Sequence, residues 1–232
     1  MSRDEQNNEE EYIEEVQAGS SSKFSLLNYY EENARMISIA AGVVIIVVVG
    51  IWAYFKYYVP GQEEEANAEL FMTERYFLQD SLDLALNGDG INASAIDLAG
   101  SGTVASMKAS YIAGRTLMEK GQYEEAVSYL EDVDFSDRIV GPLAKCLVGD
   151  CYSQMEQYEK AADAYMKASG MDDNNFTAPY ALTKAARVYE HLGNWSEAAD
   201  IYQTIKDDYS DTEYANQVDK YIARARAKAE RS

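Results

Sequence analysis

The side chains that carry out most enzymatic and metal chemistry are scarce in this sequence. It contains one histidine, His191, and two cysteines, Cys146 and Cys151, among 232 residues. A catalytic triad needs a base, and a zinc site needs several ligands, which neighbouring hydrogen-bonding groups hold in place. Neither cysteine is spaced to serve as a partner of His191. Five residues apart on one predicted helix, the cysteines lie too far apart for a disulfide, so we expect two buried thiols. We predict no catalytic residue, no metal site and no cofactor.

The segment Asn87-Gly88-Asp89-Gly90 superficially resembles a calcium-binding loop. Such a loop needs acidic ligands at alternating positions and a glutamate at its twelfth position. Ile91 and Leu98 occupy two of those places, so we expect a plain turn.

One short string, with an aromatic residue followed three positions later by alanine, recurs three times. It runs from Gly121 to Ala126, from Glu156 to Ala161 and from Gly193 to Ala198, so its alanines lie 35 and then 37 residues apart. A period in this range indicates small units that stack on one another, and stacked arrays bind other molecules more often than they transform them.

Each copy has the internal spacing of two helices joined by a turn. A small residue precedes the aromatic residue by nine positions, and apolar residues follow it in steps of three and four, which places them on one face of a helix. A hydrogen or a methyl group at the small position lets the two helices approach closely. The small residues are Gly114, Gly149 and Ala186, and the aromatic residues are Tyr123, Tyr158 and Trp195.

This pattern resembles the tetratricopeptide repeat family over residues 106–212. Two departures are visible: the proline that usually ends a repeat is missing, although Pro142 and Pro179 open following helices, and the first copy has Ala113-Gly114 where Leu-Gly is common. The resemblance implies an all-α fold in which three helical hairpins form a short α-solenoid.

The segments on either side of the repeats are also predicted to be helical. Residues 61–105 are expected to form a degenerate leading unit, with one amphipathic helix over Glu63–Leu86 and a short helix within Ile91–Leu98. The inward face of the long helix is Ala66, Leu70, Phe77, Leu78, Leu82 and Ala85, and the short helix is expected to run from Ile91 to Leu98. Residues 213–232 are expected to form a single capping helix, because a terminal helix with a polar outer face keeps an array soluble.

A transmembrane helix is predicted over residues 36–58. Met36 to Phe55 contains no charged residue, and 20 helical residues span about 30 Å, the thickness of the hydrocarbon core. The apolar stretch begins too late and is too long for a cleaved signal peptide, and Pro60-Gly61 is expected to end the helix. Residues 1–35 form an acidic tail that we expect to be largely disordered.

The charge balance limits the classes of partner. The chain has 40 acidic and 20 basic residues, a net charge of −20. This charge argues against nucleic acid and against anionic lipid surfaces as partners, and it favours basic partners or a solvated surface.

A partner-binding groove is predicted on the first helix of each repeat, which lines the concave side of such arrays. Arginines, tyrosines and a methionine that converge there resemble an anchor set for a peptide or protein segment. The alternative is that Arg115 and Arg187 merely pair with Asp150 and Glu190 across the groove. The predicted groove residues are Lys108, Tyr111, Arg115, Met118, Asp150, Ser153, Tyr180, Thr183, Arg187 and Glu190.

A second resemblance concerns the junction with the membrane segment. The run Asn28-Tyr29-Tyr30-Glu31-Glu32-Asn33-Ala34-Arg35-Met36, followed by one span and three repeats, is similar to the YfgM-like ancillary subunits of the bacterial Sec translocon. That resemblance implies a single-pass inner-membrane protein with its amino end in the cytoplasm and periplasmic repeats that contact emerging secreted chains, chaperones or the translocon. Lys23 and Arg35 before the span, against Lys56 after it, favour the same orientation.

Two other functions fit the same architecture. The chain could be an organelle import receptor with cytosolic repeats, or a structural factor that assembles into homo-oligomers. All three hypotheses describe a non-enzymatic protein.

Overall fold

The computed structural model describes residues 29, 31, 33–100 and 102–231, and contacts divide the chain at Pro60–Gly61 into two units. The expected disorder of the acidic tail concerns residues that, apart from a few near its end, lie outside the described ranges. Each unit is considered by itself below.

The amino-terminal part contains the apolar helix that the sequence predicts. In the described part of the chain one helix, Asn33–Leu78, is long and apolar enough to cross a membrane by length and composition. Its aliphatic side chains from Val43 to Ile51 are exposed. This exposure suits a lipid environment, where apolar side chains need no protein partner.

The expected break at Pro60-Gly61 is wrong, because α2 (Val59–Leu78) includes both residues. A π-helical turn, η1 (Tyr54–Tyr58), comes directly before it, and the Val59 N–H bonds to the Tyr54 carbonyl five residues back. Pro60 has no N–H to donate, and a wide turn of this kind changes the hydrogen-bond register at the proline so that the helix continues.

The single helix expected over Glu63–Leu86 is two helices, α2 and α3 (Leu82–Asn87). Asp80 adopts a left-handed conformation with φ of 56°, and the Ser81 N–H bonds to the Tyr76 carbonyl. This arrangement is a helix C-cap. Leu78, expected inward, is the last residue of α2 and is 83% exposed, whereas Leu70 is buried.

The turn predicted at Asn87-Gly88-Asp89-Gly90 is confirmed, since α3 ends at Asn87 and no helix follows until α4 (Ala95–Leu98). Ser94 caps α4 in a reciprocal arrangement with Asp97. Thr73 of α2 donates a hydrogen bond of 2.7 Å to the Ala93 carbonyl, which fastens this loop to α2. α3 and α4 both pack on the first helix of the first repeat.

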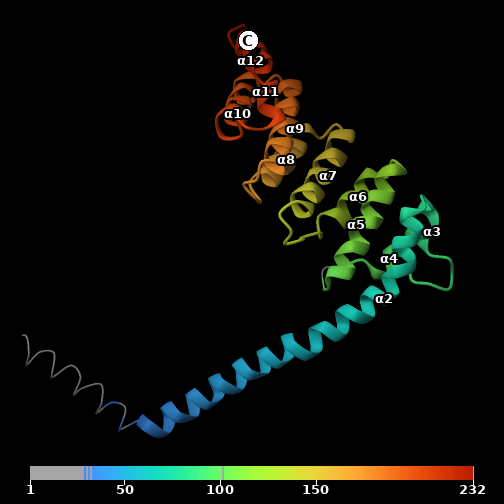
Figure 1. Cartoon of the computed structure of the whole chain (residues 1–232), viewed down its shortest axis with the longest axis vertical. Coiled ribbons are helices and arrows are strands. Elements are labelled where there is room, and N and C mark those ends of the chain that lie inside the picture. Colours follow the sequence, from blue (N-terminus) through green and yellow to red (C-terminus); the bar gives the residue numbers. More distant parts are fainter. Residues whose placement is uncertain (1–28, 30, 32, 101, 232) are drawn as a thin grey trace, which may run out of the picture. The chain divides into compact units, whose positions relative to one another are not determined.

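Three helical hairpins follow, as predicted. The first is α5 (Val104–Glu119) with α6 (Tyr123–Leu130), the second α7 (Val140–Gln154) with α8 (Tyr158–Ser169), and the third α9 (Thr177–Leu192) with α10 (Trp195–Asp208). Figure 1 shows them stacked in chain order, with each hairpin beside the next. Over the described residues, the predicted all-α array of three stacked hairpins is confirmed.

The small residues have the role that their spacing predicts. A Cβ atom on Gly114 would lie 2.5 Å from Leu130 Cγ, and one on Gly149 would lie 2.5 Å from Tyr165 Cε1. Both distances are far below van der Waals contact. The two helices of each of these hairpins therefore approach more closely than an ordinary side chain would allow.

The single capping helix expected over residues 213–232 is also two helices, α11 (Glu213–Asn216) and α12 (Asp219–Ala229). Between them the backbone hydrogen bonds reach back three residues, from Gln217 N–H to the Tyr214 carbonyl and from Val218 N–H to the Ala215 carbonyl. The bend lets Val218, 2% exposed, pack with α10 beside the buried side chains of α12. The array thus ends in a covered core.

Candidate partner-binding groove

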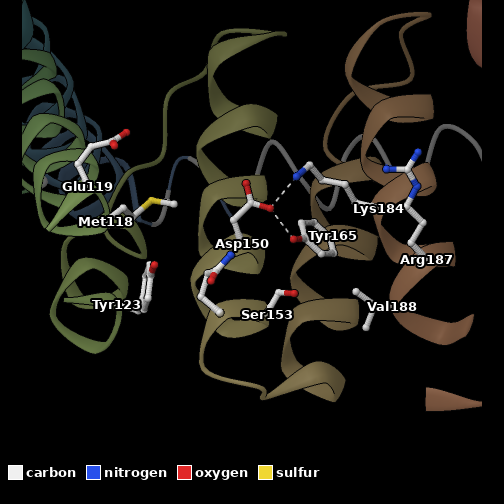
Figure 2. A pocket seen from close by; sticks show the side chains of 10 residues that line it. Met118, Glu119, Tyr123, Asp150, Ser153, Tyr165, Lys184, Arg187 and Val188 are labelled. Carbon is white, nitrogen blue, oxygen red and sulfur yellow. Dashed lines mark hydrogen bonds and ion pairs between the residues drawn. The ribbon is translucent and has the colours of Figure 1, made fainter. Parts of the chain in front are cut away.

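The first helices of the three repeats, α5, α7 and α9, supply most of the walls of one cavity of about 490 Å³. Met118 and Glu119 come from the end of α5, Asp150 and Ser153 from α7, and Arg187 from α9. The second helices contribute Tyr123 and Tyr165. Residues far apart in the sequence are brought together because the hairpins stack with their first helices in line, as Figure 2 shows.

Asp150 is the polar centre of this groove. Its Oδ1 atom accepts a hydrogen bond of 2.5 Å from the Tyr165 hydroxyl and one of 2.7 Å from Lys184 Nζ (Figure 2). Lys184 also lies over the rings of Tyr165 and Tyr180, at 5.5 and 5.2 Å from their centroids. One carboxylate therefore ties the second hairpin to the third.

The titration of the groups around Asp150 reflects this tie. Burial, and then the hydrogen bond to Asp150, raise the pKa of Tyr165 above its usual value. Burial lowers the pKa of Lys184, but the hydrogen bond and the charge of Asp150 outweigh it, so the net effect raises that pKa. Tyr165 stays protonated and Lys184 stays charged across the neutral range.

The cross-groove pairings proposed from the sequence are wrong in their partners. Arg115 pairs with Glu119, four residues along its own helix, at 3.2 Å. Glu190 accepts hydrogen bonds of 2.7 and 2.5 Å from Arg224 of α12. Among the described residues, Arg187 makes no ion pair with a carboxylate. Helix periodicity within one repeat does not show which of these charges neutralise one another.

The predicted groove residues are distributed over three cavities. Met118, Asp150, Ser153 and Arg187 line the central groove. Thr183, together with Arg187, lines a cavity of about 580 Å³ beside α11 and α12. Lys108 and Tyr111 line a largely apolar cavity of about 490 Å³ with Phe77 and Leu78 of α2.

The remaining predicted residues do not line the central groove: Tyr180 lies beside Lys184, and Arg115 and Glu190 are held in the ion pairs described above. Lys184 and Tyr165 are groove-lining side chains that sequence reasoning missed. Lys184 follows Asp150 by 34 residues, about one repeat period, and opposite charges at that spacing are a signal that could have revealed the pair.

The cysteines and the histidine that were considered for catalysis do not line the central groove. The buried Cys146 and Cys151 are free thiols, and burial raises the pKa of Cys146 to about 12 and that of Cys151 to about 11. The His191 ring packs on Tyr158 with 4.1 Å between ring centroids. Within the described ranges, no group of three or more His, Cys, Asp or Glu side chains could hold a metal ion.

Comparison with known proteins identifies the repeats. Models of the tetratricopeptide repeat match residues 108–134, 144–175 and 180–212. No curated protein sequence matches the chain.

Three solved structures resemble the chain at low sequence identity. The first, from Podosopora anserina, is described as a kinesin light chain with nearly identical TPR-like repeats; it is 14% identical, with a TM-score of 0.52, and the match covers 73% of this chain and 89% of that one. PcrH from Pseudomonas aeruginosa is 19% identical, with a TM-score of 0.40, covering 55% and 92%. MamA is 15% identical, with a TM-score of 0.45, covering 72% and 93%. The first likeness shows the fold.

Proposed function

Three segments of the chain match models of the tetratricopeptide repeat, and from that premise we propose that the chain is a non-enzymatic, membrane-anchored scaffold whose central groove binds a protein partner. Repeat solenoids present extended concave surfaces that bind other chains. Their stacking leaves a groove wherever first helices line up, so the expected ligand is an extended or helical polypeptide segment.

The observation that carries the proposal is the mixed chemistry of the central groove. Met118, Tyr123 and the ring of Tyr165 offer apolar contact area, while Arg187 offers a charge that no carboxylate of the described chain neutralises. Binding surfaces that use a few aromatic, Met and Arg anchors are typical of protein interfaces. Since Asp150 already accepts hydrogen bonds from Tyr165 and Lys184, these three side chains are held in place before any partner arrives.

The surroundings of the groove do not favour an enzyme. The thiols of Cys146 and Cys151 are buried and protonated, and His191 lies against an aromatic ring beside a turn. General acid–base catalysis needs a group with a pKa near the working pH within reach of the substrate. These surroundings therefore favour a scaffold over an enzyme.

We further propose that the protein is located in the bacterial inner membrane and acts near the secretion translocon or in periplasmic chaperoning. The apolar helix Asn33–Leu78 supports a single span over residues 36–58, with Trp52, Tyr54, Tyr57 and Tyr58 grouped at the carboxyl end of that span as in an interfacial belt. Lys56 lies 4.6 Å from the centroid of the Trp52 ring, which suits a headgroup-level anchor. The junction motif and the basic residues before the span favour a cytoplasmic amino end.

Site-specific photo-crosslinking in growing cells tests the partner. A crosslinker at Ser153, in the groove, should capture translocon subunits or chains arrested during export. The matched control is Asp163 on the second helix of the same repeat, which lines a different cavity. Capture at Ser153 of other copies of this chain alone would favour assembly into homo-oligomers and contradict the proposal, and equal capture at both positions would remove the role of the groove.

Protease accessibility tests on which side of the inner membrane the repeats lie. Residues 61–232 should be protected in intact cells and cleaved in spheroplasts, where the outer membrane is opened. Cleavage only after the inner membrane is broken would place the repeats in the cytosol and contradict the periplasmic assignment.

A further inference from the structure

A second cavity, of about 580 Å³, lies at the carboxyl-terminal end of the array and is separate from the central groove except for Arg187, which lines both. Side chains from α9, α10, α11 and α12 form it. Its walls are aromatic: Phe176 is 55% exposed, and Tyr214 and Tyr221 face the same space. A cavity that combines aromatic walls with polar groups such as Arg187 and Thr183 is typical of a site that receives a side chain.

Tyr202 lines this cavity and has an unusual hydroxyl. The residue is 1% exposed, and its Oη atom has no hydrogen-bond partner. Burying a hydroxyl without a partner costs free energy, and nearly all buried polar groups avoid that cost. In the described chain only one other buried side-chain oxygen, Thr116 Oγ1, is in the same position, and Thr116 does not line the cavity.

The electrostatic surroundings of this hydroxyl favour an acceptor. Burial, foremost, raises the pKa of Tyr202 to about 12, so the phenol remains a donor at neutral pH. Among nearby charges, Glu190 and Arg224 neutralise each other, whereas Arg187 acts on the hydroxyl and has no carboxylate partner in the described chain. Tyr202, whose hydroxyl has no acceptor among the described residues, and Arg187, which pairs with no carboxylate there, therefore line the same cavity.

We propose that this cavity is an anchor site for an apolar side chain that a partner polypeptide carries next to a single acidic side chain. The apolar side chain would enter between Phe176 and Tyr214, and the carboxylate would accept hydrogen bonds from Arg187 and Tyr202. This ligand class rests on the proposed function, because the partner is taken to be a polypeptide.

The rim of the cavity sets the limit on the charge of the ligand. Asp211 and Glu213 line it as well, and both are exposed. They oppose a run of acidic residues, because like charges repel at close range. One carboxylate next to an apolar residue satisfies the inner donors without a second negative charge at the rim.

Fluorescence anisotropy with capped peptides tests this directly on the full-length protein in zwitterionic lipid nanodiscs. The probe is a fluorescein-labelled peptide, blocked at both ends, with Asp-Phe within a Gly-Ser sequence. Replacement of its aspartate by asparagine should weaken binding about tenfold, the loss expected for a charge-assisted hydrogen bond. Replacement of the aspartate by three consecutive aspartates should not strengthen binding.

Two protein variants separate binding from folding. Tyr202→Phe keeps the ring and removes the unpartnered hydroxyl, so it should weaken the Asp-Phe peptide about fivefold while the unfolding midpoint stays the same or rises. Arg187→Gln should abolish the preference for aspartate over asparagine. The matched control is Thr116→Val, which removes the other unpartnered hydroxyl and should leave peptide affinity unchanged.

Equal affinity for the Asp-Phe and Asn-Phe peptides, or wild-type affinity in Tyr202→Phe, would overturn the proposal. So would an equal loss in Thr116→Val, since the effect would then not be local to the cavity. If the peptides fail to bind while crosslinks at Ser153 persist, the ligand class is wrong and the scaffold function stands. If both fail, the scaffold function is wrong too.

Discussion

The close contact at Gly149 allows a test of how tightly the hairpins are packed. A Cβ atom there would lie 2.5 Å from Tyr165 Cε1 and 2.7 Å from Cδ1. Tyr165 is 3% exposed, and its hydroxyl is bound to Asp150, so the ring cannot move aside without stretching that bond. Gly149→Ala should therefore destabilise the protein, although alanine is the better helix former.

The magnitude follows from three opposing effects. Alanine gains about 1 kcal/mol over glycine in a helix interior. Overpacking of a closed core costs about 2 kcal/mol, and weakening the hydrogen bond to the partly exposed carboxylate of Asp150 costs about 1 kcal/mol. The net loss is about 2 kcal/mol, which lowers the unfolding midpoint of a domain of this size by roughly 4–8 °C.

Thermal unfolding of the full-length protein in detergent, followed by circular dichroism at 222 nm, measures this loss. The matched control is Gly170→Ala, because the atoms nearest to a Cβ there are 3.7 Å or more away. The control should leave the midpoint unchanged or raise it slightly.

A second background isolates the cause. In Tyr165→Phe the ring is no longer held by Asp150, so Gly149→Ala should cost less there than in the wild type, a coupling that a double-mutant cycle measures. The third repeat already places Ala186 opposite Tyr202, whose hydroxyl has no partner. A midpoint that rises in Gly149→Ala as it does in Gly170→Ala would refute the close-packing argument.

Two further predictions concern titration. Bonds from the Asn92 and Ile91 N–H groups, and then from Tyr76, lower the pKa of Asp89, so its contribution to stability is present above the usual pKa near 4 and is lost as the pH falls through the lowered value. Asp89→Asn should thus lower the unfolding midpoint at pH 7 but less at pH 3, and an equal loss at both would contradict this. Cys146 and Cys151, with pKa values raised to about 12 and about 11, should react with a disulfide reagent at pH 8 only after urea unfolds the chain; rapid reaction of the folded protein would show that the thiols are accessible.

The repeats could be predicted because their constraints are local and periodic. The small residue at Gly114 and Gly149, and the aromatic residue nine positions later, express one geometric need: two helices in close contact after a short turn. Each copy repeats that need, so three weak patterns reinforce one another, and the structure shows the expected hairpins.

The ends of the flanking helices could not be predicted, because single residues decided them. Proline usually ends a helix, but the π turn before Pro60 changes the hydrogen-bond register so that the helix continues. α2 ends because Asp80 adopts a left-handed conformation, which aspartate adopts more readily than most residues. The neighbouring residues in the sequence do not indicate this conformation. Helix periodicity predicts which residues share a face of a helix better than it predicts where the helix ends.

The ion pairs between neighbouring hairpins could not be predicted from one helix at a time. Asp150 pairs with Lys184, Glu190 with Arg224 and Arg138 with Asp172, and in each pair the partners lie 34 residues apart. Stacking at a period of about this length places one hairpin's charge beside the next hairpin's.

Once charges that pair at this spacing are removed, and Arg115 is assigned to Glu119 on its own helix, Arg187 is the cation that is left in the groove. What an array offers to a partner is therefore what its own stacking leaves unneutralised. That remainder can be sought in a sequence by comparing each charge with the residues one repeat away. In this chain it selects the same arginine that borders both the central groove and the aromatic cavity.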